Sequence, residues 1–303
     1  MRNVWREGPQ MKLTGAKMMR RFCLVFIFAG VMASLAHAQA ASQVPLEGQL
    51  YCSGIVTSDS VPTDTYIISG EESYFRITYA DGKLVFLNKG SSQGVKVGDQ
   101  FEVIRPTPID YLQYEWFRDQ AKLLKAMGTT YEDEARIRVV SVQPNTSTAE
   151  VVFSCGYVQR ADLVQPFVPR PAPMIKSGEG FDIFAPPSGK SKAMIVTTRY
   201  FGELAADGKI VYVNLGSAQS VKVGDYFRIF RFQGNSDEIE YQTPRVAYQV
   251  FGFGSSPRPY AGAELPRDIL GEGVVLRVSK NAATLLITLS KKQIYPGDYV
   301  ELE

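Results

Sequence analysis

Apolar residues in this chain fall into short runs that are separated by residues favouring turns. Two of the clearest runs, 84–87 and 210–213, are apolar at every position, and each follows an Asp-Gly dipeptide, at 81–82 and 207–208. Asp-Gly is a typical hairpin turn, because glycine accepts the positive φ that a tight turn between twisted strands needs. β-Branched and aromatic runs bounded in this way predict strands.

Further runs extend the same pattern through both halves of the chain. The segments 136–142 and 148–153 are joined by a turn sequence, as are 273–278 and 283–288, so each pair predicts a hairpin. Several short strands punctuated by turns favour an all-β fold. We expect small closed barrels, because closure removes the exposed strand edges that promote aggregation.

An internal repeat organises these strands into two sets. Residues 80–105 align without a gap to residues 206–231, with 16 of 26 positions identical at a constant offset of 126. Such a repeat predicts a duplicated domain. We therefore expect two tandem small β-barrel domains, at 45–166 and 178–303. Prolines occupy four of the eight positions 166–173, and they predict that 167–177 is a stiff, extended linker or a strap lying on a domain surface.

The two copies differ most in their middle segments. In the first copy, residues 110–127 predict one helical insertion, with Asp110 as its N-cap. The apolar side chains of this stretch recur near one helical face: Leu112, Trp116, Leu123 and Met127. In the second copy, residues 257–266 contain three prolines, which a regular helix does not tolerate. Variable segments on a rigid scaffold are where binding usually resides.

The first forty residues have the order of a secretory signal peptide. A basic stretch ending at Arg21 precedes an apolar run at 22–32, and small residues follow. The run is shorter than the roughly 20 apolar residues that a membrane-spanning helix needs. We predict a signal peptide over 1–40 that is cleaved after Ala38 or Ala40, with an uncleaved membrane anchor as the alternative.

Removal of this leader changes the charge balance. The whole chain has 33 basic and 31 acidic side chains and a formal charge of +2, whereas residues 41–303 carry 27 basic and 30 acidic side chains. The basic excess therefore belongs to the leader, and the exported part has a net charge of −3. We expect no nucleic-acid partner, because nucleic-acid-binding domains carry a basic patch of their own.

Two cysteines remain beyond the leader, Cys52 and Cys155. An even pair in a chain sent to an oxidising compartment predicts a disulfide. The bond would close a loop of about 100 residues and stabilise the first domain by at most about 4–5 kcal/mol if the effect is one of chain entropy. Two buried free thiols are the alternative interpretation.

The repeated pattern Asn-x-Gly-Ser-x-Gln-x-Val-Lys-Val-Gly-Asp-x-Phe, at 88–101 and 214–227, resembles the C-terminal domain of the flagellar assembly protein T family. The Gly-Asp turns also resemble those of cradle-loop barrels, in which the turn is structural. Ser220 departs from the pattern at the position that Gly94 occupies in the first copy. The resemblance covers about a fifth of the chain. It implies a periplasmic β-barrel module of the bacterial envelope and no active site.

Several kinds of chemistry lack the residues that they need. The only histidine, His37, lies in the leader, so the exported part has no Ser-His-Asp triad, Cys-His pair or histidine metal site. The stretch Ser188-Gly-Lys-Ser191 is similar to part of a phosphate-binding loop, but Phe184 stands where that motif needs a glycine. We expect no nucleotide, no other cofactor, no metal and no catalytic residues.

The acidic residues have structural interpretations. Asp99, Asp225 and Asp298 each follow a glycine in a repeated turn, so we expect them to bond to their own backbone rather than act as a carboxylate set. The acidic runs 71–72 and 132–134 are interpreted as solvated loops, because a calcium site needs several oxygen ligands at ordered spacing.

Aromatic residues in the two insertions are the candidate interaction surface. Tyr111, Tyr114 and Trp116 lie in the first insertion and Tyr260 in the second. Such side chains offer a large contact area with a polar tip, which suits a glycan or a protein. The alternative is that they pack the insertions onto the barrels.

These observations together favour a non-enzymatic, exported protein of the bacterial cell envelope that acts as a protein-interaction or assembly module. Its expected partners are envelope proteins, and its expected location is the periplasm or the outer membrane, with the medium as the alternative. A cell-wall or polysaccharide binder that uses the insertion aromatics is the alternative function. An enzyme of this composition would be restricted to carboxylate chemistry.

Overall fold

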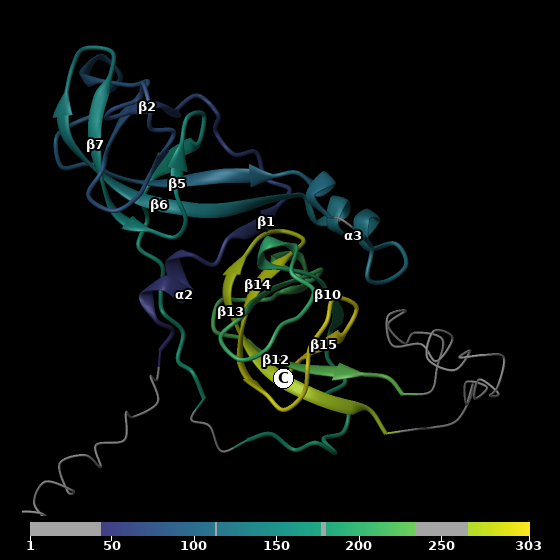
Figure 1. Ribbon diagram of the computed structural model, residues 1–303. Helices are drawn as coiled ribbons and strands as arrows, with labels where there is room; N and C mark the ends of the chain where they lie inside the picture. The colour runs from purple at the N-terminus through teal and green to yellow at the C-terminus, as the bar shows by residue number, and fades with distance from the viewer. Residues whose placement is uncertain (1–43, 113, 177–179, 234–265) are drawn as a thin grey trace, which may run out of the picture. The chain divides into compact units, whose positions relative to one another are not determined.

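Two sets of antiparallel strands dominate the regular structure of the computed structural model, which describes residues 44–112, 114–176, 180–233 and 266–303 (Figure 1). Residues 43–303 belong to one compact unit. We call the strands up to residue 166 the N-terminal module and those from residue 192 the C-terminal module. The leader predicted over 1–40 lies outside the described residues.

The C-terminal module is a closed barrel of six strands in the order β10-β11-β14-β13-β12-β15. All neighbouring pairs are antiparallel. The strands span the following residues: β10 Lys192–Thr198, β11 Ile210–Val213, β12 Tyr226–Arg231, β13 Asp268–Val278, β14 Ala283–Ser290 and β15 Tyr299–Leu302.

The N-terminal module is a seven-stranded sheet with the path β2-β4-β7-β6-β5-β9, and β1 pairs with β6 beside this path. A bridge between Tyr66 and Leu163 connects the two end strands. Two short strands, β3 and β8, form a separate pair. The strands span the following residues: β1 Ile55–Thr57, β2 Ile67–Gly70, β3 Thr78–Tyr79, β4 Leu84–Leu87, β5 Gln100–Thr107, β6 Thr129–Val142, β7 Ser147–Ser154, β8 Val158–Gln159 and β9 Leu163–Pro166.

The strand order is the same in both modules when β2, β4, β7, β6, β5 and β9 are matched to β10, β11, β14, β13, β12 and β15. Short 3-10 turns, η1 (Ser91–Gln93) and η4 (Ser217–Gln219), occupy the same place in each repeat. The predicted all-β fold with a helical insertion is confirmed, and the C-terminal module is the predicted closed barrel. The duplication itself stays a prediction from the sequence repeat.

The helical insertion is shorter than the sequence predicted. The helix α3 spans Gln120–Met127 instead of starting at residue 110, and Asp110 lies in the 3-10 turn η2 (Ile109–Tyr111) without capping a helix. The reason is the side chain of Gln120, which accepts a hydrogen bond from the Trp116 amide at 2.7 Å and donates to the Val196 carbonyl at 2.7 Å. These bonds hold the preceding chain in a non-helical turn.

Each module has its own interior core, formed by the inward-facing residues of the strands. Ile67, Val85, Val103 and Ile137 belong to the core of the N-terminal module. Val211, Phe227, Ile229 and Leu285 belong to that of the C-terminal barrel. Strand β4 alternates between buried and half-buried residues, whereas every residue of β11 is buried. Another part of the chain therefore covers the outer face of β11 as well.

A third core lies between the modules. Leu50 of the short helix α2 (Glu47–Tyr51), Val56 of β1, and Leu124 and Met127 of α3 pack against outward-facing residues of the C-terminal barrel. These barrel residues come from four strands: Val196, Ile210, Tyr212, Val274, Leu276 and Leu286. Burial of these apolar side chains stabilises the contact. Segments of the first half of the chain therefore cover the outer wall of the C-terminal barrel.

Candidate functional site

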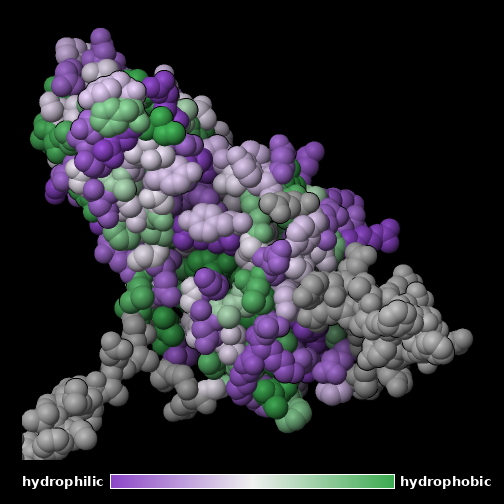
Figure 2. Space-filling view, viewed as in Figure 1, coloured by the Kyte–Doolittle hydropathy of each residue, from purple (hydrophilic) through white to green (hydrophobic). Residues whose placement is uncertain are grey.

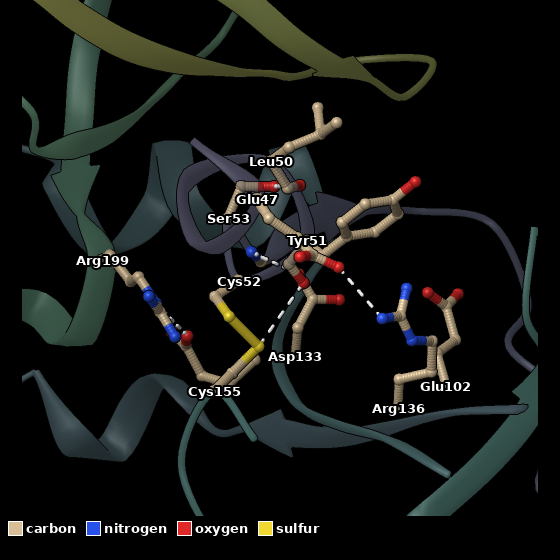
Figure 3. The surroundings of a disulfide bond; sticks show 12 residues. Glu47, Leu50, Tyr51, Cys52, Ser53, Glu102, Asp133, Arg136, Cys155 and Arg199 are labelled. Atoms are coloured by element: carbon tan, nitrogen blue, oxygen red, sulfur yellow. Dashed lines mark hydrogen bonds and ion pairs between the residues drawn. A yellow bond between two sulfur atoms is a disulfide. The ribbon is translucent and has the colours of Figure 1, made fainter. Parts of the chain in front are cut away.

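The predicted disulfide is present and lies near the contact between the modules. Cys52, just after α2, is bonded to Cys155, just after β7, with their Cα atoms 5.3 Å apart (Figure 3). The bond fixes α2 to the N-terminal module, while Leu50 of α2 packs on the C-terminal barrel. The disulfide therefore holds part of the contact between the modules in place.

Three consecutive carboxylates on β6 lie next to this disulfide, and all three are buried: Glu132, Asp133 and Glu134. The interpretation of residues 132–134 as a solvated loop is therefore wrong. Each carboxylate has an arginine partner from a distant part of the chain, as buried charges require. The ion pairs are Glu132 with Arg199 at 3.0 Å, Asp133 with Arg170 and Arg277 at 3.1 Å each, and Glu134 with Arg105 at 2.8 Å.

Asp133 is the centre of this charge cluster. Its carboxylate accepts hydrogen bonds from the guanidinium groups of Arg170 and Arg277 and from the Gly54 amide at 2.8 Å. Burial acts to raise the pKa of Asp133, but the two arginines and these bonds outweigh it and lower the pKa below its usual value. Asp133 is therefore ionised in the folded protein at neutral pH.

Arg170 connects the proline-rich segment to the same cluster. Besides Asp133, its guanidinium group binds the Glu102 carboxylate at 2.6 Å and the Leu50 carbonyl at 3.1 Å. It also lies 5.5 Å from the centre of the Tyr51 ring. The segment predicted as a linker over 167–177 is thus fastened at Arg170 to the N-terminal module and α2.

Glu132 and Glu134 differ from Asp133 in their electrostatics. Burial raises the pKa of Glu132, and it raises that of Glu134 to about 7, although Arg199 and Arg105 oppose these shifts. One oxygen of Glu132, Oε1, has no hydrogen-bond partner among the described residues. Glu134 therefore changes its charge near neutral pH, at a position beside the disulfide.

A second arrangement of charges occurs once in each module. Arg105 binds Asp162 through two hydrogen bonds of 2.7 and 2.8 Å, and Arg231 binds Asp298 through two of 2.6 and 2.8 Å. Each aspartate also accepts a backbone amide three residues before it. Each pair connects β5 or β12 to the turn before the last strand of the module. The sequence carries a signal for these two arginines, because each repeated segment, 80–105 and 206–231, ends in an arginine.

The other repeated residues also have structural roles. Asp99 and Asp225 accept the backbone amides of Lys96 and Lys222 at 2.9 and 2.8 Å, which confirms the turn interpretation. Gly216 lies so close to the Ser279 carbonyl that a Cβ atom would be 2.4 Å from the oxygen. Gly90 has the corresponding close contact in the N-terminal module. At these positions, the identity of the two repeats is therefore explained by turns and close backbone contacts.

The candidate interaction aromatics do not form one exposed platform. Trp116 is only 6% exposed and lies between Tyr114 and Tyr295, with ring centres 5.1 and 6.1 Å away. Trp116 therefore packs among protein side chains rather than lying on an exposed surface. Tyr111 and Tyr114 are exposed, and Tyr114 donates a hydrogen bond to Glu203. Tyr260 lies outside the described residues.

A more exposed apolar segment is a loop that the sequence analysis did not select. Tyr74, Phe75 and Ile77, between β2 and β3, are 85%, 63% and 80% exposed. The sequence carries a signal for this loop, because the dipeptide Tyr74-Phe75 recurs as Tyr200-Phe201 at the same offset of 126 residues as the repeat. Large apolar side chains gathered at the surface are typical of sites that bind other molecules.

The segment Ser188-Gly-Lys-Ser191 has a partner that a phosphate-binding loop would not have. The Ser188 amide donates to a carboxylate oxygen of Glu301 at 3.4 Å, where a phosphate would be repelled. A surface hollow of about 410 Å³ in the N-terminal module is lined by Lys89, Asp99 and Phe101 among others.

The residues that the structure describes lack two further features. They contain no group of three or more histidine, cysteine, aspartate or glutamate side chains placed to hold a metal ion. Within the same part of the chain, no helix is both long and apolar enough to cross a membrane. Among known proteins, the chain matches neither a family model nor a curated protein.

Proposed function

We propose that this chain is an exported, non-enzymatic protein of the bacterial cell envelope that serves as a module for protein interaction or assembly. One observation carries the proposal, namely that the outer wall of the C-terminal barrel already binds protein segments. Helices α2 and α3 and strand β1 cover it with apolar contacts. A barrel wall of this kind is therefore suited to docking protein elements.

The buried charges also support a structural role. The carboxylates of the β6 cluster and of the two modules' Arg-Asp pairs are bonded to arginines or to backbone amides. These bonds orient segments that are far apart in the sequence, and they account for the unusual burial of so many charges. The arrangement does not require a reaction to explain it.

Export is supported by the leader sequence and by the disulfide. Disulfides persist in oxidising compartments, such as the periplasm, and are rare in the cytosol. The bond between Cys52 and Cys155 therefore fits a chain that leaves the cytoplasm. We place the protein in the periplasm or at the outer membrane.

Crosslinking in intact cells of the source organism tests the partner and the compartment together. Cells are treated with a periplasm-permeable crosslinker, fractionated, and the complexes are purified through a C-terminal tag for mass spectrometry. We expect envelope proteins joined to a chain that lacks residues 1–38 or 1–40. A chain that retains the leader and stays in the cytosolic fraction would contradict the proposal.

A polysaccharide-binding function is the second candidate, because Tyr114 is exposed beside Trp116 and Tyr111 is exposed in the same insertion. Trp116 is the only tryptophan beyond the leader, so its fluorescence reports on this place alone. Titration with soluble peptidoglycan fragments should leave the emission unchanged if the protein binds proteins only. A saturable change that is lost in Tyr111→Ala would favour the polysaccharide function.

A further inference from the structure

The surface hollow of about 410 Å³ in the N-terminal module has the size of a small-molecule site, since such sites measure about 300–1,000 Å³. We call it the β5–β9 hollow. It is formed by the loop before β2, the turn η1 after β4, the start of β5 and strand β9. The side chains that the argument uses are Asp64, Lys89, Gln93, Asp99, Phe101 and Pro166.

Hydrogen bonds fix the loop before β2 at the rim of the β5–β9 hollow. The Asn88 side chain accepts a hydrogen bond from the Tyr66 amide at 2.8 Å and donates one to the Asp64 carbonyl at 2.8 Å. On the other side, the Val164 amide of β9 donates to the Thr65 carbonyl at 2.9 Å. The hollow is therefore built into the module, so a ligand does not have to order this loop when it binds.

Apolar side chains form one part of the lining. Phe101 packs on the core of the N-terminal module but is only half-buried, whereas Val95 and Val164 are buried in that core. Figure 2 shows hydrophobic and hydrophilic side chains side by side over the N-terminal module, and the hollow has a lining of the same mixed kind. An apolar surface with a few polar groups is typical of small-molecule sites.

Polar side chains form the other part, and the positive charge among them is already balanced. Lys89 forms an ion pair with Asp64, and its hydrogen bond lowers the pKa of that carboxyl group. Asp99 accepts a backbone amide with one oxygen at 2.9 Å and adds a negative charge. Gln93 accepts a backbone amide with its side-chain oxygen at 2.9 Å, so its NH₂ group is the end that donates to a ligand. The lining therefore combines donors with acceptors.

The C-terminal barrel has apolar residues at the equivalent place. In the repeat, Lys89 corresponds to Leu215 and Phe101 corresponds to Phe227. Leu215 is buried and Phe227 is fully buried, and both belong to the core of that barrel. The aromatic ring that reaches the surface in one module is thus covered in the other.

Strand β9 differs from its counterpart β15 in the same sense. Pro166 pairs with Phe101, whereas Leu302 pairs with Phe227 and packs on the core of the C-terminal barrel. The barrel fold is therefore formed with this place closed, and it does not require a hollow there. The replacements that open it in the N-terminal module need another explanation, which a ligand provides.

We propose that the β5–β9 hollow binds a neutral sugar unit, with the apolar face of the sugar ring on Phe101 and its hydroxyl groups on the polar side chains. Hydroxyl groups both donate and accept hydrogen bonds, as this lining requires. An anion is disfavoured, because Asp64 and Asp99 are negative and Lys89 is already paired. The inference goes beyond the proposed function, since it adds a small ligand to a protein-interaction module.

An NMR titration of the isotope-labelled exported chain tests the proposal. The probes are four neutral disaccharides, namely maltose, cellobiose, lactose and chitobiose, together with inorganic phosphate and arginine amide as charged probes. We expect the backbone amide signals of residues 89–101 to shift saturably with at least one disaccharide. We expect neither charged probe to shift them.

Variants that copy the C-terminal barrel should close the hollow without disturbing the fold. Lys89→Leu and Pro166→Leu each introduce the residue of the other module, and each should weaken disaccharide binding about tenfold or more. The matched control is Lys96→Leu, which removes the same charge from an exposed lysine outside the lining and should bind like the wild type. Unchanged thermal melting shows that each variant is folded.

Three results would overturn the inference: no shift of these signals with any of the disaccharides, a shift with a charged probe instead, or wild-type binding by both Lys89→Leu and Pro166→Leu. A sugar that changes the fluorescence of Trp116 but leaves these signals in place would also overturn it, because the binding site would then lie in the helical insertion. None of these results alters which proteins crosslink to the chain in cells, so the proposed function and this inference fail separately.

Discussion

Positions at which the two repeats differ show what single residues contribute. Gly94 and Ser220 occupy the same place after the 3-10 turns, and both have a positive φ, of 87° and 66°. Glycine adopts this conformation freely, whereas serine is strained there. The surroundings of Gly94 are open, so the difference between the two positions lies in the backbone.

Exchange of these two residues should have opposite effects. Ser220→Gly is expected to raise the free energy of unfolding by about 1 kcal/mol, because strain is relieved without loss of a packed side chain. Gly94→Ser should lower it by a similar amount. Urea denaturation measures both changes. If both substitutions shift the stability in the same direction, the equivalence of the two turns is wrong.

Glu134 should make stability depend on pH. Its pKa is about 7 in the folded protein, against 4.5 for an ordinary glutamate, because burial disfavours the charged form. Between these two values the folded protein holds a proton that the unfolded chain has released, so the free energy of unfolding falls as the pH rises. The contribution of Glu134 is present below pH 4.5 and is lost above about pH 7.

The isosteric variant Glu134→Gln removes this titration. Urea unfolding at intervals from pH 4.5 to 7.5 should show a smaller decline for Glu134→Gln than for the wild type. Glu132→Gln is a useful comparison, because the pKa of Glu132 is also raised by burial. An unchanged slope in Glu134→Gln would contradict the assignment.

At the scale of elements, the disulfide holds α2 in place, and α2 and α3 are two of the segments that cover the C-terminal barrel. The bond closes a loop with a sequence separation of 103 residues. Replacing both cysteines, Cys52→Ser with Cys155→Ser, should lower the free energy of unfolding by up to about 4–5 kcal/mol if chain entropy dominates. Urea denaturation with and without a reductant measures this. A loss below about 1 kcal/mol would show that the bond adds little to the fold.

Local patterns predicted some elements and missed others for a physical reason. The strands β4 and β11, their Asp-Gly turns and the repeated turn aspartates follow from neighbouring residues, and the sequence predicted them correctly. The acidic run of β6 was misjudged because its arginine partners are distant along the chain, as Arg277 is 144 residues from Asp133. The helix start was wrong because Gln120 binds Val196 of another module.

At the scale of the whole molecule, one barrel wall is covered by the chain itself and the equivalent wall is open. The turn and strand pattern does not reveal this difference, because both repeats share it. The difference lies in a few outward residues: Ile210, Val274 and Leu286 in the covered wall correspond to Leu84, Arg138 and Glu150 in the open one. The charged pair of Arg138 with Glu150 suits this wall to contact with solvent.

Site-specific photocrosslinking in cells tests most directly whether the protein works by binding other proteins. A photoreactive amino acid replaces Ile77 in the exposed loop, and in a matched strain it replaces Val97, which is also apolar and exposed. After irradiation, the adducts are purified and identified by mass spectrometry. The account predicts abundant protein adducts from position 77 and few from position 97. An absence of protein adducts at position 77, or only polysaccharide fragments there, would contradict it.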